Sequence, residues 1–231
     1  MRKNNQYYIR KAHCYLGLAI GIQFIFWTIS GMYFSWTDID EIHGDHFRAD
    51  HMHHESKGLI GITEIDSNLV VSSLSLRYIN GEPYYWVNQS QLYHALTGVP
   101  KEGVSEEEAR SIAMHHLKSD MEIESIELIT EVDSHHEYRG RALPAYVLQF
   151  EGSDQVRAYI SQADGRFQTL RHRDWRWFDF LWMTHTMDYQ GRDDINNTLL
   201  RIFSLFGLVT VASGFVLFFA TVRFKRRKTK V

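Results

Sequence analysis

The sequence predicts an α+β membrane protein in which two transmembrane helices bracket a domain built of a helix on an antiparallel sheet. Two observations lead to this fold class. The chain has one long apolar segment near each end, 15–36 and 198–222, and the stretch between them is polar and rich in strand and turn signals. All 28 acidic residues lie in that middle stretch, whereas the two tails carry only basic charge.

The two apolar segments have the length and composition of membrane spans. Segment 15–36 contains no charged residue, and at a helical rise of 1.5 Å it covers roughly 33 Å, close to the hydrocarbon thickness of about 30 Å. Segment 198–222 holds one charge, Arg201, which can snorkel to the interface. Buried core helices are the alternative, but they rarely run this long without charge. The first segment also lacks a small-residue cleavage site, which favours a retained anchor over a signal peptide.

Charge sets the predicted orientation. The basic tails, 1–14 and 223–231, are expected in the cytoplasm, which places residues 37–197 outside it. The only cysteine is Cys14, so the outer domain has no intrachain disulfide. We expect the inner membrane of a bacterium, with the middle of the chain in the periplasm. Directly after a span, the basic tail 223–231 indicates contact with anionic lipids and not with nucleic acid.

The first part of the middle stretch, 37–103, begins as a polar, histidine-rich loop that could include a helical turn. Strand-like segments follow at 74–79 and 84–87, and the Asn80-Gly81 pair between them is a type I′ hairpin signal. A third strand is expected at 91–96, ending at Thr97-Gly98.

The second part, 104–173, predicts a helix followed by strands. Ser105 and Glu108 form a capping box, and the inward stripe of the helix is expected to consist of Ala109, Ile112, Ala113, His116 and Leu117. Strands are expected at 123–130, 145–150, 156–161 and 167–170, the last after the Asp164-Gly165 turn. A strand ending in a glycine turn occurs in both parts, which suggests a degenerate duplication. Segment 174–197 mixes tryptophans with charges and predicts a helix along the membrane surface.

Several motifs carry a resemblance to a known family. They are His13-Cys14-Tyr15-Leu16-Gly17-Leu18 followed by Gly21, the Ser-Gly steps Ser30-Gly31 and Ser213-Gly214, the segment 40–47, the segment 184–188, and Asn196-Asn197. With the helix and strands of 104–173, their order resembles the PepSY-associated transmembrane proteins, over nearly the whole chain. The resemblance implies an inner-membrane protein with an extracytoplasmic PepSY-like domain. Larger relatives with four spans resemble haem-containing reductases of ferric siderophores, which implies haem b and electron transfer.

His13 is the candidate haem ligand in the first span. It shares a helical face with Gly31, and Gly17 and Gly21 lie near the same stripe. Glycines let another backbone or a flat macrocycle approach closely, and a histidine at the head of such a groove can serve as an axial ligand. The alternative is a polar residue that heads a helix-packing face.

His185 and His46 form a second candidate haem or metal site near the outer surface. Asp188 follows His185 by three positions and could orient its imidazole, while His46 follows the first span closely. Two ordinary surface histidines are the alternative. His13 lies ~30 Å from this level, so two haems would occupy two sites. Each would borrow a ligand from a second subunit, either in a homodimer or from a partner membrane subunit.

The loop after the first span could also capture a metal ion. It contains five histidines within a short stretch, and neutral imidazole suits Zn²⁺, Cu²⁺ and Ni²⁺. The residues are His43, His46, His51, His53 and His54. The spacing of these histidines does not by itself identify a metal site, so a flexible polar loop is the alternative.

Two function classes therefore stand beside metal capture. One is a haem-binding electron-transfer component linked to reduction or uptake of iron or siderophores. The other is a non-enzymatic, membrane-anchored module whose outer domain contacts an extracytoplasmic peptidase or assembly partner. The sequence shows no nucleophile elbow, phosphate-binding glycine loop, dinucleotide fingerprint or HExxH, so it does not decide whether the chain is an enzyme.

Overall fold

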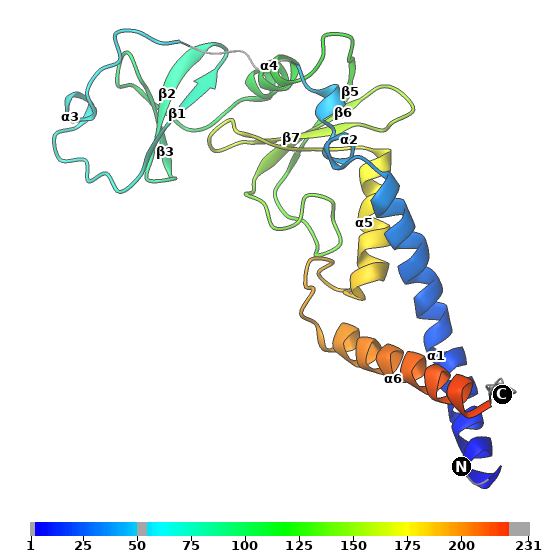
Figure 1. Ribbon diagram of the computed structural model, residues 1–231. Helices are drawn as coiled ribbons and strands as arrows, with labels where there is room; N and C mark the ends of the chain where they lie inside the picture. The colour runs from blue at the N-terminus through cyan, green and yellow to red at the C-terminus, as the bar shows by residue number, and fades with distance from the viewer. Residues whose placement is uncertain (1–2, 50–54, 222–231) are drawn as a thin grey trace, which may run out of the picture. The chain divides into compact units, whose positions relative to one another are not determined.

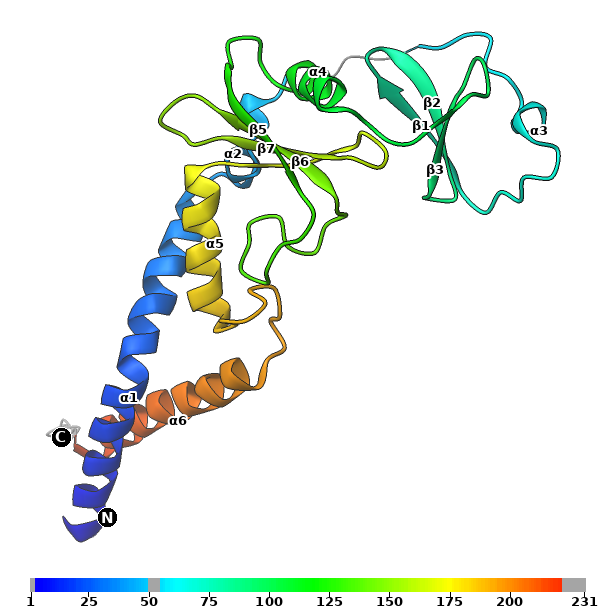
Figure 2. The same cartoon turned by 180° about the vertical axis from the view of Figure 1, so that it is seen from behind.

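The computed structural model describes residues 3–49 and 55–221, which fall into two compact units (Figures 1 and 2). The helical unit comprises the residues up to 37 together with those from 179 onward. The sheet unit comprises residues 38–178. The protein is thus an α+β protein with two long apolar helices and two antiparallel sheets.

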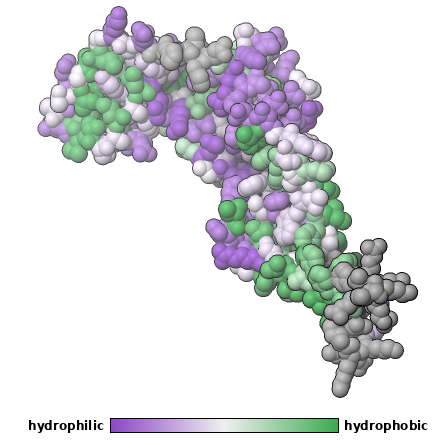
Figure 3. Space-filling view, viewed as in Figure 1, coloured by the Kyte–Doolittle hydropathy of each residue, from purple (hydrophilic) through white to green (hydrophobic). Residues whose placement is uncertain are grey.

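The helical unit is built on α1 (Lys3–Trp36) and α6 (Thr198–Thr221), with the end of α5 (Arg173–Thr186) beside them. Both α6 and the Tyr7–Trp36 part of α1 are long and apolar enough to cross a membrane. A core helix of a soluble protein is mostly buried, but only 17% of the most apolar window of α1 and 11% of that of α6 is buried. Figure 3 shows apolar side chains at the surface of these helices. The structure therefore favours two candidate spans over core helices.

Helix α1 is longer than the predicted span. It begins at Lys3, so much of the predicted tail 1–14 is helical and His13 lies well inside the helix. The candidate span starts at Tyr7, six residues before His13. Helix α6 closely matches the predicted segment 198–222 within the described residues.

The sheet unit contains two four-stranded antiparallel meanders. The first consists of β1 (Leu74–Ile79), β2 (Glu82–Val87), β3 (Gln91–His94) and β4 (Pro100–Lys101). The predicted turn is confirmed, because Asn80 and Gly81 both have positive φ, 52° and 80°, as a type I′ turn requires. The second sheet consists of β5 (Ile123–Ile129), β6 (Ala145–Phe150), β7 (Arg157–Ser161) and β8 (Phe167–Arg171).

Helix α4 (Glu106–His116) packs between the sheets and completes the main core. The predicted capping box is present: the Ser105 hydroxyl accepts from the Glu108 amide, and the Glu108 carboxylate accepts from the Ser105 amide. The predicted stripe is confirmed except at His116, which is exposed and stacks its imidazole on Phe167. The core contains residues of both sheets and α4, among them Ile79, Trp86, Leu92, Ile112, Leu148, Phe150, Ile160 and Leu170.

The opposite face of the second sheet is covered by the β5–β6 connection, residues 130–144. Tyr138 from this connection is fully buried and stacks on Tyr159 of β7, with ring centroids 4.6 Å apart. Beside them the Glu137 carboxylate accepts hydrogen bonds from the Tyr159 hydroxyl at 2.6 Å and from Arg176 Nε at 2.6 Å. This carboxylate joins the connection to β7 and to the first turn of α5.

The segment that enters the sheet unit forms short helices that the sequence only hinted at. Helix α2 (Ile39–His43) is capped by Asp38 and ends at Gly44, followed by the 3₁₀ helix η1 (Asp45–Phe47). Gly44 has φ +81°, and a Cβ there would collide with the Leu170 side chain of β8. Glycine therefore allows this turn to lie directly against the sheet. Helix α3 (Ile62–Ile65) and strand β4 were not predicted.

Candidate functional site

His13 and the second candidate span are joined by a hydrogen bond inside the helical unit. The Nδ1 atom of His13 lies 2.7 Å from the Ser213 hydroxyl of α6. That hydroxyl donates its single hydrogen to the Thr210 carbonyl at 2.7 Å. With that hydrogen directed at the carbonyl, Ser213 accepts from His13, and this arrangement favours the tautomer with the proton on Nδ1.

His185 has the same environment at the other end of α1. It lies in the last turn of α5, and its Nδ1 atom is 2.7 Å from the Ser30 hydroxyl of α1. The Ser30 hydroxyl lies 2.6 Å from the Phe26 carbonyl, and donation to that carbonyl leaves the hydroxyl oxygen to accept from the imidazole. The edge of the imidazole faces Phe34, with ring centroids 5.7 Å apart.

With both hydroxyl hydrogens directed at carbonyls, these two contacts favour the same tautomer in both histidines. With the proton on Nδ1, each Nε2 atom presents a lone pair, and this is the form in which a neutral imidazole binds a metal. Neither Nε2 atom has a hydrogen-bond partner among residues 3–49 and 55–221. A second group that orients the ring through Nδ1 is the usual companion of a metal-ligating histidine.

Glycines reduce the side-chain bulk near His13 on both α1 and α6. A Cβ at Gly214 would lie 3.3 Å from the His13 Cε1 atom, so the imidazole packs directly on the α6 backbone. A Cβ at Gly17 or Gly21 of α1 would meet no atom within 4 Å. An open apolar groove of about 430 Å³ is lined by residues of α6 alone: Val211, Gly214, Phe215, Phe218 and Phe219.

The end of α5 is anchored by polar side chains of α1. Gln23 Nε2 donates to the Thr184 carbonyl at 2.9 Å, and Trp27 Nε1 donates to the His185 carbonyl at 2.7 Å. The last carbonyls of a helix have no partner within the helix, so these donors satisfy two of them. The predicted helix in segment 174–197 is confirmed over Arg173–Thr186, and its orientation in a membrane stays a prediction.

Asp188 does not orient His185 in the predicted way. Helix α5 ends at Thr186 and Met187 has φ +55°, so Asp188 lies beyond the helix and shares no helical face with His185. Its carboxylate accepts from the backbone amides of Gly191 at 3.1 Å and Asp194 at 2.9 Å. Asp188 therefore shapes the connection to α6, while Ser30 orients the imidazole.

His46 lies in the sheet unit, and its predicted pairing with His185 stays a prediction. It is exposed, and its ring centroid is 3.9 Å from that of Phe47 and 5.5 Å from that of His172. His172 is only 2% exposed, and its Nε2 donates to the Ile42 carbonyl at 3.0 Å. Burial lowers the pKa of His172, and the charge of His46 adds to the effect.

The predicted metal loop is only partly within the described residues. His43 is exposed at the end of α2. His51, His53 and His54 lie outside the described residues. Within residues 3–49 and 55–221, no group of three or more histidine, cysteine or acidic side chains is arranged to hold a metal ion.

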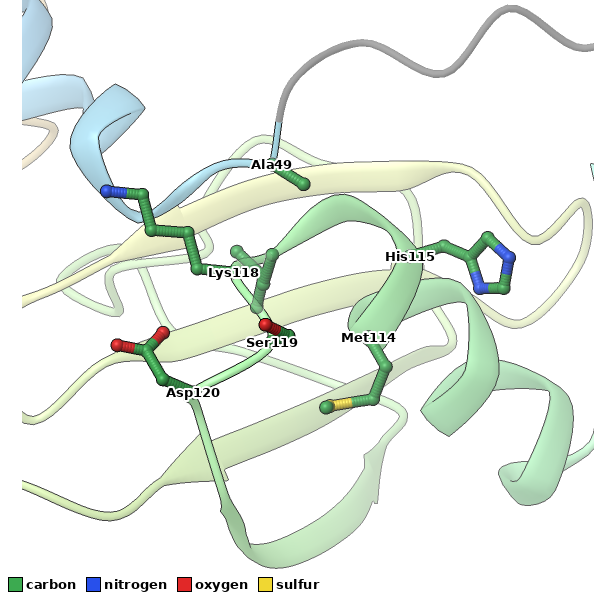
Figure 4. Close-up of a pocket in the computed structure, with 7 residues that line it drawn as sticks. Ala49, Met114, His115, Lys118, Ser119 and Asp120 are labelled. Carbon is green, nitrogen blue, oxygen red and sulfur yellow. The ribbon is translucent and has the colours of Figure 1, made fainter.

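A depression of about 580 Å³ lies at the end of α4, beside Ala49. Figure 4 shows that its side chains diverge: the His115 imidazole points away from Lys118 and Asp120. Convergent polar groups are what a small-molecule site needs, so this depression is not a candidate site.

Comparison with protein-family models, with curated proteins and with solved structures found no match to this chain. Fold and site therefore define a class only: an α+β protein with two candidate membrane-spanning helices and two helical histidines, each hydrogen-bonded through Nδ1 to a serine.

Two kinds of residue with a structural role were not predicted from the sequence. Ser30 and Ser213 were noted as parts of Ser-Gly steps but not as partners of histidines, because residues 155 and 200 positions apart give no local signal of contact. His172 was missed because a single histidine next to a strand does not reveal its burial.

We expect His172→Gln to reduce the acid sensitivity of the sheet unit. A histidine whose folded-state pKa is lowered binds protons more readily when unfolded, so its contribution to stability is lost as the pH falls below about 6.5. Glutamine can still donate to the Ile42 carbonyl but does not titrate. The difference between thermal midpoints at pH 7.5 and 5.5 should be smaller in the variant, while His115→Gln on exposed α4 should match the wild type. An unchanged difference in the His172 variant would contradict the assignment.

Proposed function

We propose that this chain is a haem-binding electron-transfer protein of the bacterial inner membrane, related to the PepSY-associated transmembrane proteins. We infer that it serves reduction or uptake of iron or ferric siderophores. The observation that carries the proposal is the matched pair of histidines, each with Nδ1 hydrogen-bonded to a serine hydroxyl and Nε2 without a hydrogen-bond partner in the described residues.

The residues around His13 fit haem b. The ring is held in one orientation by Ser213, Gly214 lets the imidazole lie against α6, and Gly17 leaves open space on α1. Phe215 and Phe218 supply the apolar wall that a porphyrin face requires. Haem bound here would supply one-electron chemistry. His13 would hold the iron, and the apolar wall would keep water away from it.

The two histidines would serve two separate sites. His13 and Ser30, the partner of His185, are both on α1, and the helical rise places them about 25 Å apart along its axis. One haem cannot span that distance. His13 is also the only histidine in either candidate span. A second histidine ligand at its level would therefore come from a second copy of the chain or from a partner membrane subunit.

The proposed orientation follows from charge. The tails carry only basic charge and the middle stretch carries every acidic residue, which favours cytoplasmic termini and a periplasmic sheet unit. The site at His13 would then lie toward the cytoplasm and the site at His185 toward the periplasm. Electrons from a cytoplasmic donor could reach an extracytoplasmic acceptor through two such sites.

The test is an absorption spectrum of the full chain purified in detergent from cells supplied with a haem precursor. We expect a Soret band and, after dithionite, the sharp bands of a reduced b-type haem. Colourless protein with intact helical circular dichroism would contradict the proposal.

A second candidate is a non-enzymatic module that docks a partner through the sheet unit. Apolar side chains near the edges of the first sheet favour it: Val70 is 82% and Val99 60% exposed, and Figure 3 shows apolar surface over β1–β3. This candidate predicts colourless protein, and loss of partner binding when Val70 and Val99 are replaced by serine.

A further inference from the structure

The covered face of the second sheet contains an arginine cluster, which we define as Arg141, Arg157, Arg171 and Arg176. Arg157 and Arg171 are directly opposite each other in the register of β7 and β8. Like charges in this position destabilise a sheet unless an anion lies between or beside them. The cluster also lies in the part of the chain that contains all 28 acidic residues.

Glu137 neutralises only part of this cluster. Its carboxylate accepts from Arg176 at 2.6 and 3.1 Å and from Arg157 at 3.4 Å, in addition to the Tyr159 hydroxyl. The side chain of Glu137 is 10% exposed, so it has little room for more donors. One carboxylate therefore serves two of the four guanidinium groups.

Arg171 is fixed in place without a carboxylate. Its Nε donates to the Glu137 carbonyl at 3.1 Å and its Nη1 to the Leu170 carbonyl at 3.0 Å, and the guanidinium lies 3.9 Å above the Trp175 ring. Within residues 3–49 and 55–221, no carboxylate forms an ion pair with Arg171. Burial and the charge of Arg141 lower the pKa of Arg171 to about 10, and the charge of Glu137 opposes them only in part.

A second guanidinium without a carboxylate partner, that of Arg141, is held on the same strand, three positions from Arg171, and its charge acts on Arg171. Its Nη1 donates to the Gln168 carbonyl of β8 at 2.9 Å, and its side chain is exposed. In the described part of the chain it too has no carboxylate partner. Within the described ranges, the remaining N–H groups of both guanidinium groups form no hydrogen bond.

We propose that Arg141 and Arg171 form a binding site for a small oxyanion, a carboxylate or a phosphate group. Guanidinium groups match such anions through paired N–H donors, and a partly buried guanidinium such as that of Arg171 favours the bound anion more than an exposed lysine would. Trp175 closes one side of the site, and Glu137 keeps Arg157 and Arg176 in place next to it. The site does not depend on the proposed haem function.

The experiment measures thermal unfolding and calorimetric binding of the detergent-purified full chain with inorganic phosphate and with citrate, at constant ionic strength set by sodium chloride. We expect saturable stabilisation by at least one of the two anions. Arg141→Gln and Arg171→Gln should each weaken binding at least tenfold. Arg110→Gln, on the exposed face of α4, is the matched control and should bind like the wild type.

A second arm distinguishes a free anion from a lipid headgroup. The same titrations are repeated in nanodiscs of phosphatidylcholine alone and of phosphatidylcholine with phosphatidylglycerol. Competition by the anionic lipid would identify the phosphate of a headgroup as the source, whereas equal affinity in both discs would identify a free anion. Binding that is absent, or unchanged in Arg141→Gln, would overturn the proposal. Arg141 is exposed, so this variant decides the matter even if Arg171→Gln does not fold.

Discussion

Replacing Glu137 with glutamine is expected to lower the free energy of unfolding of the sheet unit by about 3 kcal/mol, the low end for breaking a buried ion pair. The carboxylate is nearly buried and binds two arginines and a tyrosine hydroxyl. A carboxamide can still accept from Tyr159, but it cannot compensate the charges of Arg157 and Arg176. Denaturant unfolding of the detergent-purified chain, followed by tryptophan fluorescence, measures the change.

The pH dependence should confirm the cause. Burial favours the neutral form of Glu137, but the hydrogen bonds from Arg176 and Tyr159 outweigh it and hold the pKa below the ordinary value. A carboxylate with a lowered folded-state pKa contributes stability above its unfolded pKa of about 4.3, and this contribution is lost as the pH falls through the folded value. The difference in free energy of unfolding between the wild type and the Glu137→Gln variant should therefore become smaller as the pH falls.

Glu127→Gln is the matched control for this change, because Glu127 is exposed on β5. Its substitution should alter stability by no more than about 0.5 kcal/mol. An equally small change in the free energy of unfolding for Glu137→Gln would contradict the prediction. It would mean that another group compensates the charges of Arg157 and Arg176, and that the carboxylate does not hold the connection to the sheet.

His13→Ala and His185→Ala are each expected to remove the haem held at their own level, and the double variant should be colourless. The His13 imidazole binds Ser213 of α6, and the His185 imidazole binds Ser30 of α1. Because His13 and Ser30 are about 25 Å apart along α1, neither imidazole can replace the other. The haem-to-protein ratio, measured from the spectrum of the reduced pyridine complex, checks the result.

Serine substitutions separate ligation from orientation. Ser213→Ala leaves the His13 Nε2 atom in place but removes the acceptor for Nδ1, so haem affinity at that level should fall about 10–100-fold without complete loss. His115→Ala, on the exposed end of α4, should leave the spectrum unchanged. A full haem complement in the double histidine variant would place the ligands elsewhere.

Local signals in the sequence account for much of the fold. A type I′ turn requires positive φ at both central positions, and the Asn80-Gly81 pair predicted this hairpin correctly. Ser105 with Glu108 predicted the start of α4. The two apolar segments were found from length and charge alone. His116 was placed wrongly in the core because its spacing fits the buried stripe, whereas its imidazole reaches Phe167 at the surface.

What the sequence could not provide are contacts between distant segments. The bonds from His13 to Ser213 and from His185 to Ser30 depend on how three helices pack, and the role of Glu137 depends on how a connection folds over a sheet. The helical spacing that suggested Asp188 as the partner of His185 failed because α5 ends two residues earlier.

The arrangement of the serines and histidines has a consequence for motion. Helix α1 supplies the histidine of one bond, His13, and the serine of the other, Ser30. If α1 turned about its own axis or slid by one turn, about 5.4 Å, both bonds would break in the same movement. The hydrogen bonds of the two imidazoles are therefore coupled through α1. A rotation of α1 about its axis would break both bonds together.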